Sequence, residues 1–304
     1  MKKDGYISKM QDIKDIIAEI ARMTEAELEK SLPAPDPDYP VLYESERYSL
    51  FSAGKRIRPV IAVLVCRMLG GSDEAVLPFA AALEMVHCYS LIHDDLPCMD
   101  DDDLRRGRPT NHRMFGEAIA LLSGDALLTH AFAVAAGNQA VGPEKALRAV
   151  SLLSERSGGA GMVGGQVMDK LAENGNPGYR TMISMHGRKT GALIRLAAEL
   201  GAIAAGTEED DPRYASVIEY SRCVGLVFQI VDDLLDAEGD SAETGKNTGQ
   251  DEKDGKTTFL SFMDPESARQ YAAELTSEAV ASVSCIPGSG PLCELAELLL
   301  KRKK

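Results

Sequence analysis

An acidic segment contains the residues of this 304-residue chain that are best suited to chemistry. Residues 94–103 read DDLPCMDDDD, with six aspartates in ten positions, and Arg105 and Arg106 follow at once. Carboxylate oxygens are hard ligands suited to Mg²⁺, and Mg²⁺ flanked by arginines commonly holds a phosphate-bearing substrate. A run of like charges is more often a solvated segment. Here the run follows the mostly apolar stretch 84–93, which favours a site built on a packed helix.

A second acidic cluster lies far along the chain, at Asp232, Asp233 and Asp236. Asp232 and Asp236 are four residues apart, so they share one face of a helix, with Gln229 one turn earlier. Like charges at this spacing repel, and a cation between them would remove the repulsion. The apolar residues at 226–235 disfavour a solvated edge. Two such clusters on two apolar helices predict a cavity with Mg²⁺ held between facing walls.

The helix expected before the first cluster carries further polar residues on one face. The positions that recur at helical spacing are Glu84, His87, Leu91, Asp94 and Asp95. His87 therefore lies about two turns below the aspartates. On position alone, a satisfied core histidine and a functional histidine are equally good interpretations. Pro97 ends the helix, so Asp100 must return to the site through a non-helical turn.

The basic residues form small sets rather than one stripe. They are Lys55, Arg56 and Arg58; Arg105 and Arg106; Arg188 and Lys189; and Lys246, Lys253 and Lys256. Each set is expected at a helix end or in a loop, where long cations can converge on an anion, although a surface charge is the commoner outcome. With 33 basic against 47 acidic residues, the net charge is −14, which argues against a nucleic-acid partner.

Composition and apolar patterning predict a soluble cytoplasmic protein. The six cysteines are scattered without a CxxC pair, which indicates reduced thiols. The N-terminus lacks the apolar core of a secretory signal, and no apolar run reaches the length expected of a membrane span.

The apolar periodicity predicts helices throughout and no strand. Helices are expected at 7–30, 43–51, 60–69, 74–95, 115–136, 143–156, 179–205, 213–237, 265–284 and 291–301. The proline-rich stretch 32–40 is expected to be a loop, and the polar stretch 238–256 a mobile loop. The glycine-rich segment 158–166 lacks the Gly-Lys-Ser/Thr ending of a phosphate loop, so it is interpreted as a close helix–helix approach. We expect an all-α, single-domain helical bundle around a central cavity, over residues 1–304.

Five motifs in order resemble those of the trans-isoprenyl diphosphate synthases, most of all bacterial farnesyl diphosphate synthases. They are GKRIRP at 54–59, His87, DDLPCMD at 94–100 with LRRG at 104–107, KTG at 189–191, and FQIVDDLLD at 228–236. The combination is specific, although each motif alone is weak. The resemblance covers about residues 43–258. It implies an isoprenoid synthase bundle, usually a homodimer, that elongates an allylic diphosphate with isopentenyl diphosphate.

The resemblance also implies residue roles. The expected ligands of several Mg²⁺ ions, with Mn²⁺ as an alternative, are Asp94, Asp95, Asp100, Asp232 and Asp236. The allylic diphosphate is expected to contact Arg105, Lys189, Thr190, Gln229, Lys246 and Lys256. Isopentenyl diphosphate is expected to contact Lys55, Arg58, His87 and Arg106. The catalytic set is Asp94, Asp100, Arg105, Lys189, Asp232 and Lys246. The basic residues 301–304 are expected to be a solvated tail, with closure over the isopentenyl side as the alternative.

Product length is expected to depend on the depth below the first motif, where Tyr89 and Ser90 lie. A bulky Tyr89 would stop the growing chain early, which favours farnesyl diphosphate. The nearest alternative is a geranylgeranyl diphosphate synthase with the same chemistry. A class I terpene cyclase is a weaker alternative, because it needs no second diphosphate pocket. Two departures from the family are minor: Asp101 stands where relatives often have asparagine, and residues 251–254 are unusually charged. The allylic starter and the dimer interface stay open.

Overall fold

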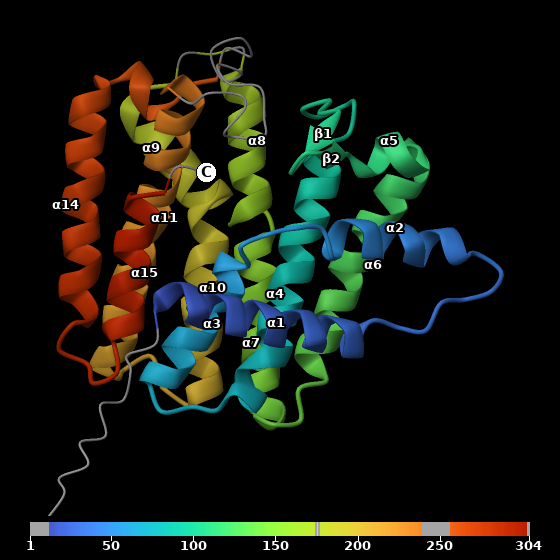
Figure 1. Cartoon of the computed structure of the whole chain (residues 1–304), viewed down its shortest axis with the longest axis horizontal. Coiled ribbons are helices and arrows are strands. Elements are labelled where there is room, and N and C mark those ends of the chain that lie inside the picture. The colour runs from blue at the N-terminus through green and yellow to red at the C-terminus, as the bar shows by residue number, and fades with distance from the viewer. Residues whose placement is uncertain (1–11, 174, 176, 239–255, 303–304) are drawn as a thin grey trace, which may run out of the picture.

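Helices make up nearly all the regular structure in this computed structural model, which describes residues 12–173, 175, 177–238 and 256–302. They are α1 (Ile13–Ser31), α2 (Pro40–Leu50), α3 (Ile57–Met68), α4 (Asp73–Asp94), α5 (Asn111–Phe115), α6 (Glu117–Ala136), α7 (Pro143–Ser157), α8 (Met162–Ala172), α9 (Tyr179–Lys189), α10 (Gly191–Ala205), α11 (Pro212–Glu238), α14 (Pro265–Val283) and α15 (Gly290–Leu300), with the 3₁₀ turn η1 (Phe259–Ser261). Strands β1 (Leu104–Arg105) and β2 (Arg108–Pro109) form one antiparallel hairpin. The expected all-α bundle is confirmed (Figure 1).

Helices α3, α4 and α10 form the centre of the bundle and pack on one another. Most residues of all three are buried, because their sequences are apolar on every side. Small residues let α3 and α10 approach closely. A β-carbon at Gly201 would lie 2.5 Å from the carbonyl oxygen of Ala62, so a larger residue there would separate the helices. Because α3 and α10 both pack on α4, the position of α4 is fixed, and so is the position of the side chains on its last turn.

The expectation of no strand is wrong at β1 and β2, because Arg106 and Gly107 turn the chain tightly enough for two residues on each side to pair. The expected helices are largely confirmed, with three differences. The stretch 115–136 is two helices, because Gly116 turns the chain with φ of 84° between α5 and α6. The stretch 179–205 is also two helices, divided at Thr190. The glycine-rich segment leads into a helix that was not expected, α8. The expected loop at 238–256 falls almost wholly on residues 239–255, which lie outside the described residues.

The glycine-rich segment brings two helices together, as predicted. A β-carbon at Gly165 of α8 would overlap the backbone nitrogen of Lys189 at the end of α9. The two helices pack along each other. Glycine at 165 therefore sets the distance between α8 and the functional segment that begins at Lys189.

Two of the described helices, α4 and α6, are long and apolar enough to cross a membrane. The expectation that no apolar run reaches this length is therefore wrong by length and composition. In the most apolar window of α4, 72% lies buried inside the bundle, as in a core helix of a folded domain. The corresponding share for α6 is 33%, so much of its apolar surface faces outward.

Glu46 on α2 is a buried carboxyl whose titration affects stability. Burial raises its pKa from 4.5 to about 7. The folded state therefore holds a proton that the unfolded chain releases, and the free energy of unfolding falls as pH rises between these values. At pH 8, Glu46→Gln is expected to increase the free energy of unfolding by about 3 kcal/mol, and at pH 4.5 to leave it nearly unchanged. Denaturation at both pH values measures this, with exposed Glu44→Gln as control. An equal gain at both would contradict the prediction.

Candidate active site

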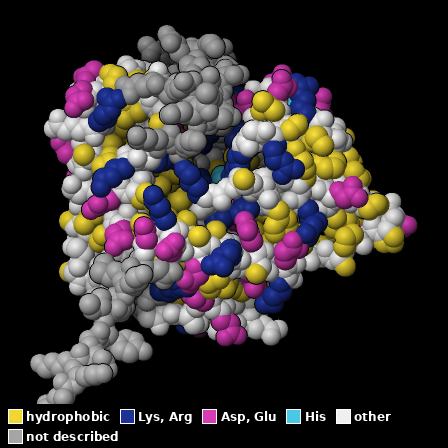
Figure 2. All heavy atoms as spheres, viewed as in Figure 1, with side chains coloured by type: hydrophobic (Ala, Val, Ile, Leu, Met, Phe, Trp, Pro, Cys, Tyr) yellow, Lys and Arg dark blue, Asp and Glu magenta, His cyan; other side chains and the backbone are white. Residues whose placement is uncertain are grey.

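A cavity of about 570 Å³ is lined by residues from several of the predicted sets. The predicted site residues in its wall are Arg58, His87, Tyr89, Ser90, Asp94, Lys189 and Thr190. Figure 2 shows Lys and Arg side chains gathered around a hollow near the middle of one face of the molecule. Residues that are more than a hundred positions apart in sequence thus face one space. The volume lies within the range of small-molecule sites.

The first acidic cluster is shaped by the end of α4. Helix α4 ends at Asp94 ahead of Pro97, as predicted. The backbone N–H of Asp100 then donates to the carbonyl oxygen of Asp94 at 2.9 Å, and that of Met99 donates to Leu96 at 2.8 Å. This turn returns Asp100 to the level of Asp94. The Asp100 carboxylate lies near enough that its charge helps to raise the pKa of Asp94.

Each carboxylate of this cluster faces a donor from another part of the chain. Asp94 accepts a hydrogen bond from Nε2 of Gln166 at 2.6 Å. Asp100 accepts one from Nζ of Lys170 at 2.8 Å. Asp95 is buried and accepts from Nε of Arg105 at 2.6 Å. Asp95 and Arg105, which were predicted for metal and substrate, are therefore partners of each other in this structure.

The electrostatic environment of the cluster suits a cation. Burial raises the pKa of Asp94 to about 6, because little water remains to stabilise its charge. Burial would also raise the pKa of Asp100, but the hydrogen bond from Lys170 and the charges of Lys256 and Lys189 bring it below its usual range. A divalent ion beside Asp94 would offset the burial penalty. Carboxylate oxygens are the donors that Mg²⁺ prefers, so this donor set fits it.

His87 belongs to the cavity wall rather than to the packed core. Its Nε2 lies 3.2 Å from Nη1 of Arg58. Burial and then the charges of Arg58 and Arg106 hold the pKa of His87 well below its usual value, so the ring is neutral and Nε2 accepts. The guanidinium of Arg106 packs against Gly54, where a β-carbon would lie 2.6 Å from Nη1. The structure thus places Arg58, His87 and Arg106 together, as predicted for one diphosphate.

The neighbouring basic residues have different positions. Lys55 is exposed in the loop ahead of α3. Arg56 is buried and makes an ion pair with Glu84 of α4, Nη1 to Oε1, at 2.7 Å. The GKRIRP motif therefore combines Arg58, which lines the cavity, with Arg56, which joins α3 to α4.

The second acidic cluster lies on α11, with Asp236 half-buried one turn after Asp232. The Oγ1 of Thr190 donates to Oε1 of Gln229 at 3.1 Å, which links this helix to the cavity wall. Asp232 forms an ion pair with Arg302, whose guanidinium lies 4.1 Å from the centre of the Phe228 ring. The side chain of Arg302 is only 10% exposed, so the expectation of a solvated tail is wrong for this residue.

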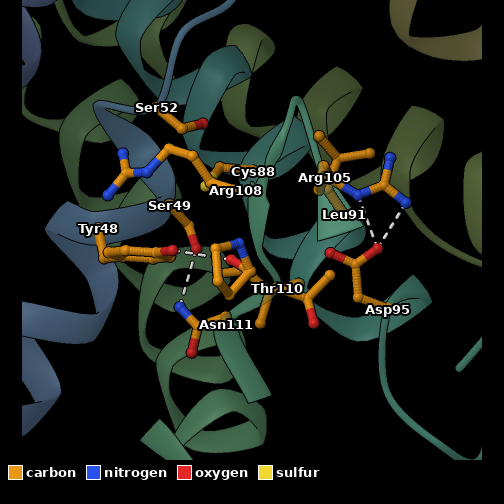
Figure 3. A pocket seen from close by; sticks show the side chains of 12 residues that line it. Tyr48, Ser49, Ser52, Cys88, Leu91, Asp95, Arg105, Arg108, Thr110 and Asn111 are labelled. Atoms are coloured by element: carbon orange, nitrogen blue, oxygen red, sulfur yellow. Dashed lines mark hydrogen bonds and ion pairs between the residues drawn. The ribbon is translucent and has the colours of Figure 1, made fainter. Parts of the chain in front are cut away.

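A polar pocket beside the cavity anchors the hairpin that carries Arg105 and Arg106 (Figure 3). The hydroxyl of Tyr48 donates to the carbonyl oxygen of Pro109 at 2.8 Å. Arg108 lies over the Tyr48 ring at 4.2 Å. Asn111 donates from Nδ2 to Oγ of Ser49 at 2.8 Å. Helices α2 and α5 thus hold β1 and β2 in place, and the hairpin directs Arg105 toward Asp95.

Three polar residues of α8 were missed by the sequence interpretation. Gln166 and Lys170 pair with the first acidic cluster, and Asp169 accepts from Nζ of Lys189 at 2.5 Å. The i, i+4 spacing of Gln166 and Lys170 was a usable signal, because it puts both on one helical face. It was overlooked because the glycines before them were interpreted only as packing residues.

Two predicted lysines follow α11 in the sequence. Lys256 lies close enough to Asp100 to lower its pKa. Lys246 lies outside the described residues and stays a prediction.

Comparison with known proteins gives one consistent result. Residues 39–284 match the family model described as polyprenyl synthetase. Geranylgeranyl pyrophosphate synthase 7 of Arabidopsis thaliana is 41% identical over 267 residues, which cover 86% of this chain and 76% of that protein. An FPP/GFPP synthase structure from Zymomonas mobilis superimposes with a TM-score of 0.85 at 35% identity, covering 95% and 98% of the two chains. A geranyltransferase structure from Legionella pneumophila gives 0.85 at 31%, covering 96% and 97%.

Proposed function

The chain belongs to the polyprenyl synthetase family and is a trans-prenyltransferase, and from this premise we propose that it condenses isopentenyl diphosphate with dimethylallyl or geranyl diphosphate to release farnesyl diphosphate. Two groups of basic and polar side chains around one cavity support two diphosphate sites. Arg58, His87 and Arg106 make up the isopentenyl side. Lys189 and Thr190 lie in the same cavity wall and make up part of the allylic side.

The proposed reaction begins when the allylic C1–O bond breaks and its electron pair leaves with the diphosphate. Arg105 and Lys189, with Lys246 assigned by resemblance, offset the charge that develops on the leaving group. The isopentenyl double bond then attacks C1 and forms the new C–C bond. A proton leaves C2 of the former isopentenyl unit, with the departed diphosphate as base, and a double bond is restored. The apolar wall, including Leu96, Leu121 and Val167, keeps water from the cation.

Asp94, Asp100, Asp232 and Asp236 are proposed to hold Mg²⁺. When bound, Mg²⁺ supplies positive charge to the oxygens of the leaving diphosphate. Asp95 was predicted to join this set, and its buried pairing with Arg105 supports a second role, which is to orient that arginine. Arg302 would move from Asp232 when a metal ion binds that carboxylate.

The proposal of a C15 product rests mainly on the position of Tyr89. This buried tyrosine lies in the cavity wall five residues before Asp94, slightly more than one turn below the acidic cluster. Its ring packs edge-on against His93, with centroids 5.6 Å apart. His93 is held in turn by α6, where its Nε2 lies 3.0 Å from the carbonyl oxygen of Leu121. A supported aromatic ring at this depth suits a floor that stops a growing chain early.

A C20 product is the second candidate, favoured by the curated relatives. Two from Arabidopsis thaliana match this chain at 41% and 42% identity, and they are described as geranylgeranyl pyrophosphate synthase 7 and as the large subunit 1 of a heterodimeric geranylgeranyl pyrophosphate synthase. The similar structures include an FPP/GFPP synthase, so that relative is described with C15 and longer products. Product analysis therefore decides between the two lengths.

Tyr89→Ala is expected to shift the main product from C15 to C20 or longer, because it removes the ring from the cavity wall. The purified protein is incubated with Mg²⁺, isopentenyl diphosphate and either dimethylallyl or geranyl diphosphate, and the chain length is measured by mass spectrometry. Tyr89→Phe keeps the ring and should keep the product of the unmodified protein. A C15 product from Tyr89→Ala would refute the floor. No product from either starter would refute the proposed function.

The homodimer and the cytoplasmic location also remain proposals. The outward apolar surface of α6, with exposed Leu122, supports contact with a second copy of the chain.

A further inference from the structure

Asp233, between the two carboxylates predicted to bind metal, is in a different environment from Asp232. Asp233 is 2% exposed, whereas the side chain of Asp232 is 48% exposed. Both oxygens of Asp233 accept hydrogen bonds. Oδ1 accepts from Nε2 of Gln229 at 2.8 Å, and Oδ2 accepts from the backbone N–H of Phe259 at 2.8 Å. The carboxylate thus connects α11 to a segment 26 residues further along.

The bond to Gln229 orients a predicted substrate contact. The amide of Gln229 donates to Asp233 and accepts from Oγ1 of Thr190 at 3.1 Å. Because one end of the amide donates and the other accepts, this arrangement fixes which way the amide faces. Thr190 lies in the cavity wall. Asp233 therefore affects the proposed allylic site indirectly, through its hydrogen bond to Gln229.

The bond to Phe259 fixes the backbone that follows Lys256. The fully buried ring of Phe259 stacks on His186, with centroids 5.5 Å apart and planes at 16°. It also lies 6.5 Å from the ring of Tyr271. Lys256, which the family resemblance assigns to the allylic side, comes three residues earlier in the chain. The anchored Phe259 therefore restricts where the backbone places this lysine.

We propose that Asp233 is a positioning residue, rather than a metal ligand, that holds Gln229 and Lys256 in place for the allylic diphosphate. The proposal rests on the proposed function for the identity of that substrate. Asp233 is 2% exposed, and both of its oxygens already bind N–H donors of the protein, so little of this carboxylate faces a space that could hold a metal ion and its other ligands. A positioning role needs no such space.

Asparagine and alanine at this position separate the two roles. Asparagine keeps an oxygen that can accept from Phe259, and its amide can pair with a rotated Gln229, but it is a poorer Mg²⁺ ligand than a carboxylate. Alanine removes both bonds. We expect Asp233→Ala to raise the KM for the allylic diphosphate about 10- to 100-fold. The KM for isopentenyl diphosphate should stay within about 3-fold, because Arg58, His87 and Arg106 are not held by Asp233.

Metal binding is measured apart from turnover, by calorimetric titration of Mg²⁺ with inorganic diphosphate. Asp233→Asn should need the same Mg²⁺ concentration as the unmodified protein, and its allylic KM should rise less than that of Asp233→Ala, because Gln229 and the Phe259 backbone keep a partner although the Gln229 amide is rotated. Asp232→Asn, the matched neighbour, should need at least about 10-fold more Mg²⁺. Circular dichroism and thermal unfolding verify the fold of each variant.

Several outcomes would overturn the proposal. One is an Asp233→Asn variant that needs as much additional Mg²⁺ as Asp232→Asn, which would make Asp233 a ligand. Another is an equal rise of both KM values in folded Asp233→Ala. If Asp233→Ala does not fold, the calorimetric comparison of the two asparagine variants decides. If the unmodified protein turns over neither starter, the proposed function fails. The calorimetric comparison still tests the role of Asp233 in that case, because it does not depend on turnover.

Discussion

Asp94→Ala is expected to lower kcat at least about 10³-fold, with Mg²⁺ at saturation. Asp94 is the last residue of α4 and lies in the cavity wall. It is held by Gln166 from α8, so its carboxylate has a fixed direction. Removing it would leave the developing charge on the leaving diphosphate without one of its metal anchors. The effect should fall on kcat more than on the KM for isopentenyl diphosphate, because that substrate is bound by other residues.

The acidic run supplies its own control for this experiment. Asp103 belongs to the same run, but its side chain is 71% exposed and pairs with Nε of Arg113 at 2.5 Å. Asp103→Asn should keep turnover within about 3-fold, since surface ion pairs contribute little. Steady-state kinetics of both variants with both substrates provide the test. Near-normal turnover by Asp94→Ala would contradict the proposal that Asp94 is a metal ligand needed for the reaction.

Glu84→Ala is expected to reduce the free energy of unfolding by about 3–5 kcal/mol. Glu84 pairs with Arg56, and both side chains are almost wholly buried, at 4% and 2% exposure. Truncating the glutamate leaves a buried guanidinium without its nearest counter-charge. Arg56 also donates to the carbonyl oxygen of Leu50 at 2.7 Å, so the pair joins α2, α3 and α4. Its loss should therefore loosen the segment that carries Arg58.

A second glutamate on the same arginine gives the comparison. Glu25 lies 3.3 Å from Nη2 of Arg56 but is 43% exposed. Glu25→Ala should cost at most about 1 kcal/mol, because water screens an exposed ion pair. Chemical denaturation followed by circular dichroism measures both losses. Equal losses from the two variants would contradict the account of the buried pair.

The helices were largely predictable because their signals are local. The break at Pro97 comes from backbone chemistry that a single residue determines. The two acidic clusters were predictable for the same reason, since four-residue spacing places carboxylates on one face. The hinge at Gly116 was missed because an isolated glycine inside an apolar stretch is tolerated in a helix.

The partners of the site residues were not predictable, because they come from distant parts of the chain. Gln166 meets Asp94 across 72 positions, and Arg302 meets Asp232 across 70. No spacing rule within one helix contains such a pairing. The basic set at 55–58 shows the same limit, since only packing separates buried Arg56 from Arg58, which lines the cavity.

Because α4 contacts α6 at His93, the proposed control of product chain length depends on the distance between these two helices. A β-carbon at Gly124 of α6 would overlap the His93 ring, which supports Tyr89. Under the proposed function, the depth of the cavity therefore depends on a residue of another helix, Gly124, which is not among the residues that line the cavity. Under the proposed function, a substitution in α6 that adds a single methyl group at Gly124 would shift His93 and Tyr89 and so change the depth of the cavity, while the acidic cluster stays unchanged. Synthases of different product length could then arise without any change in the reaction they perform.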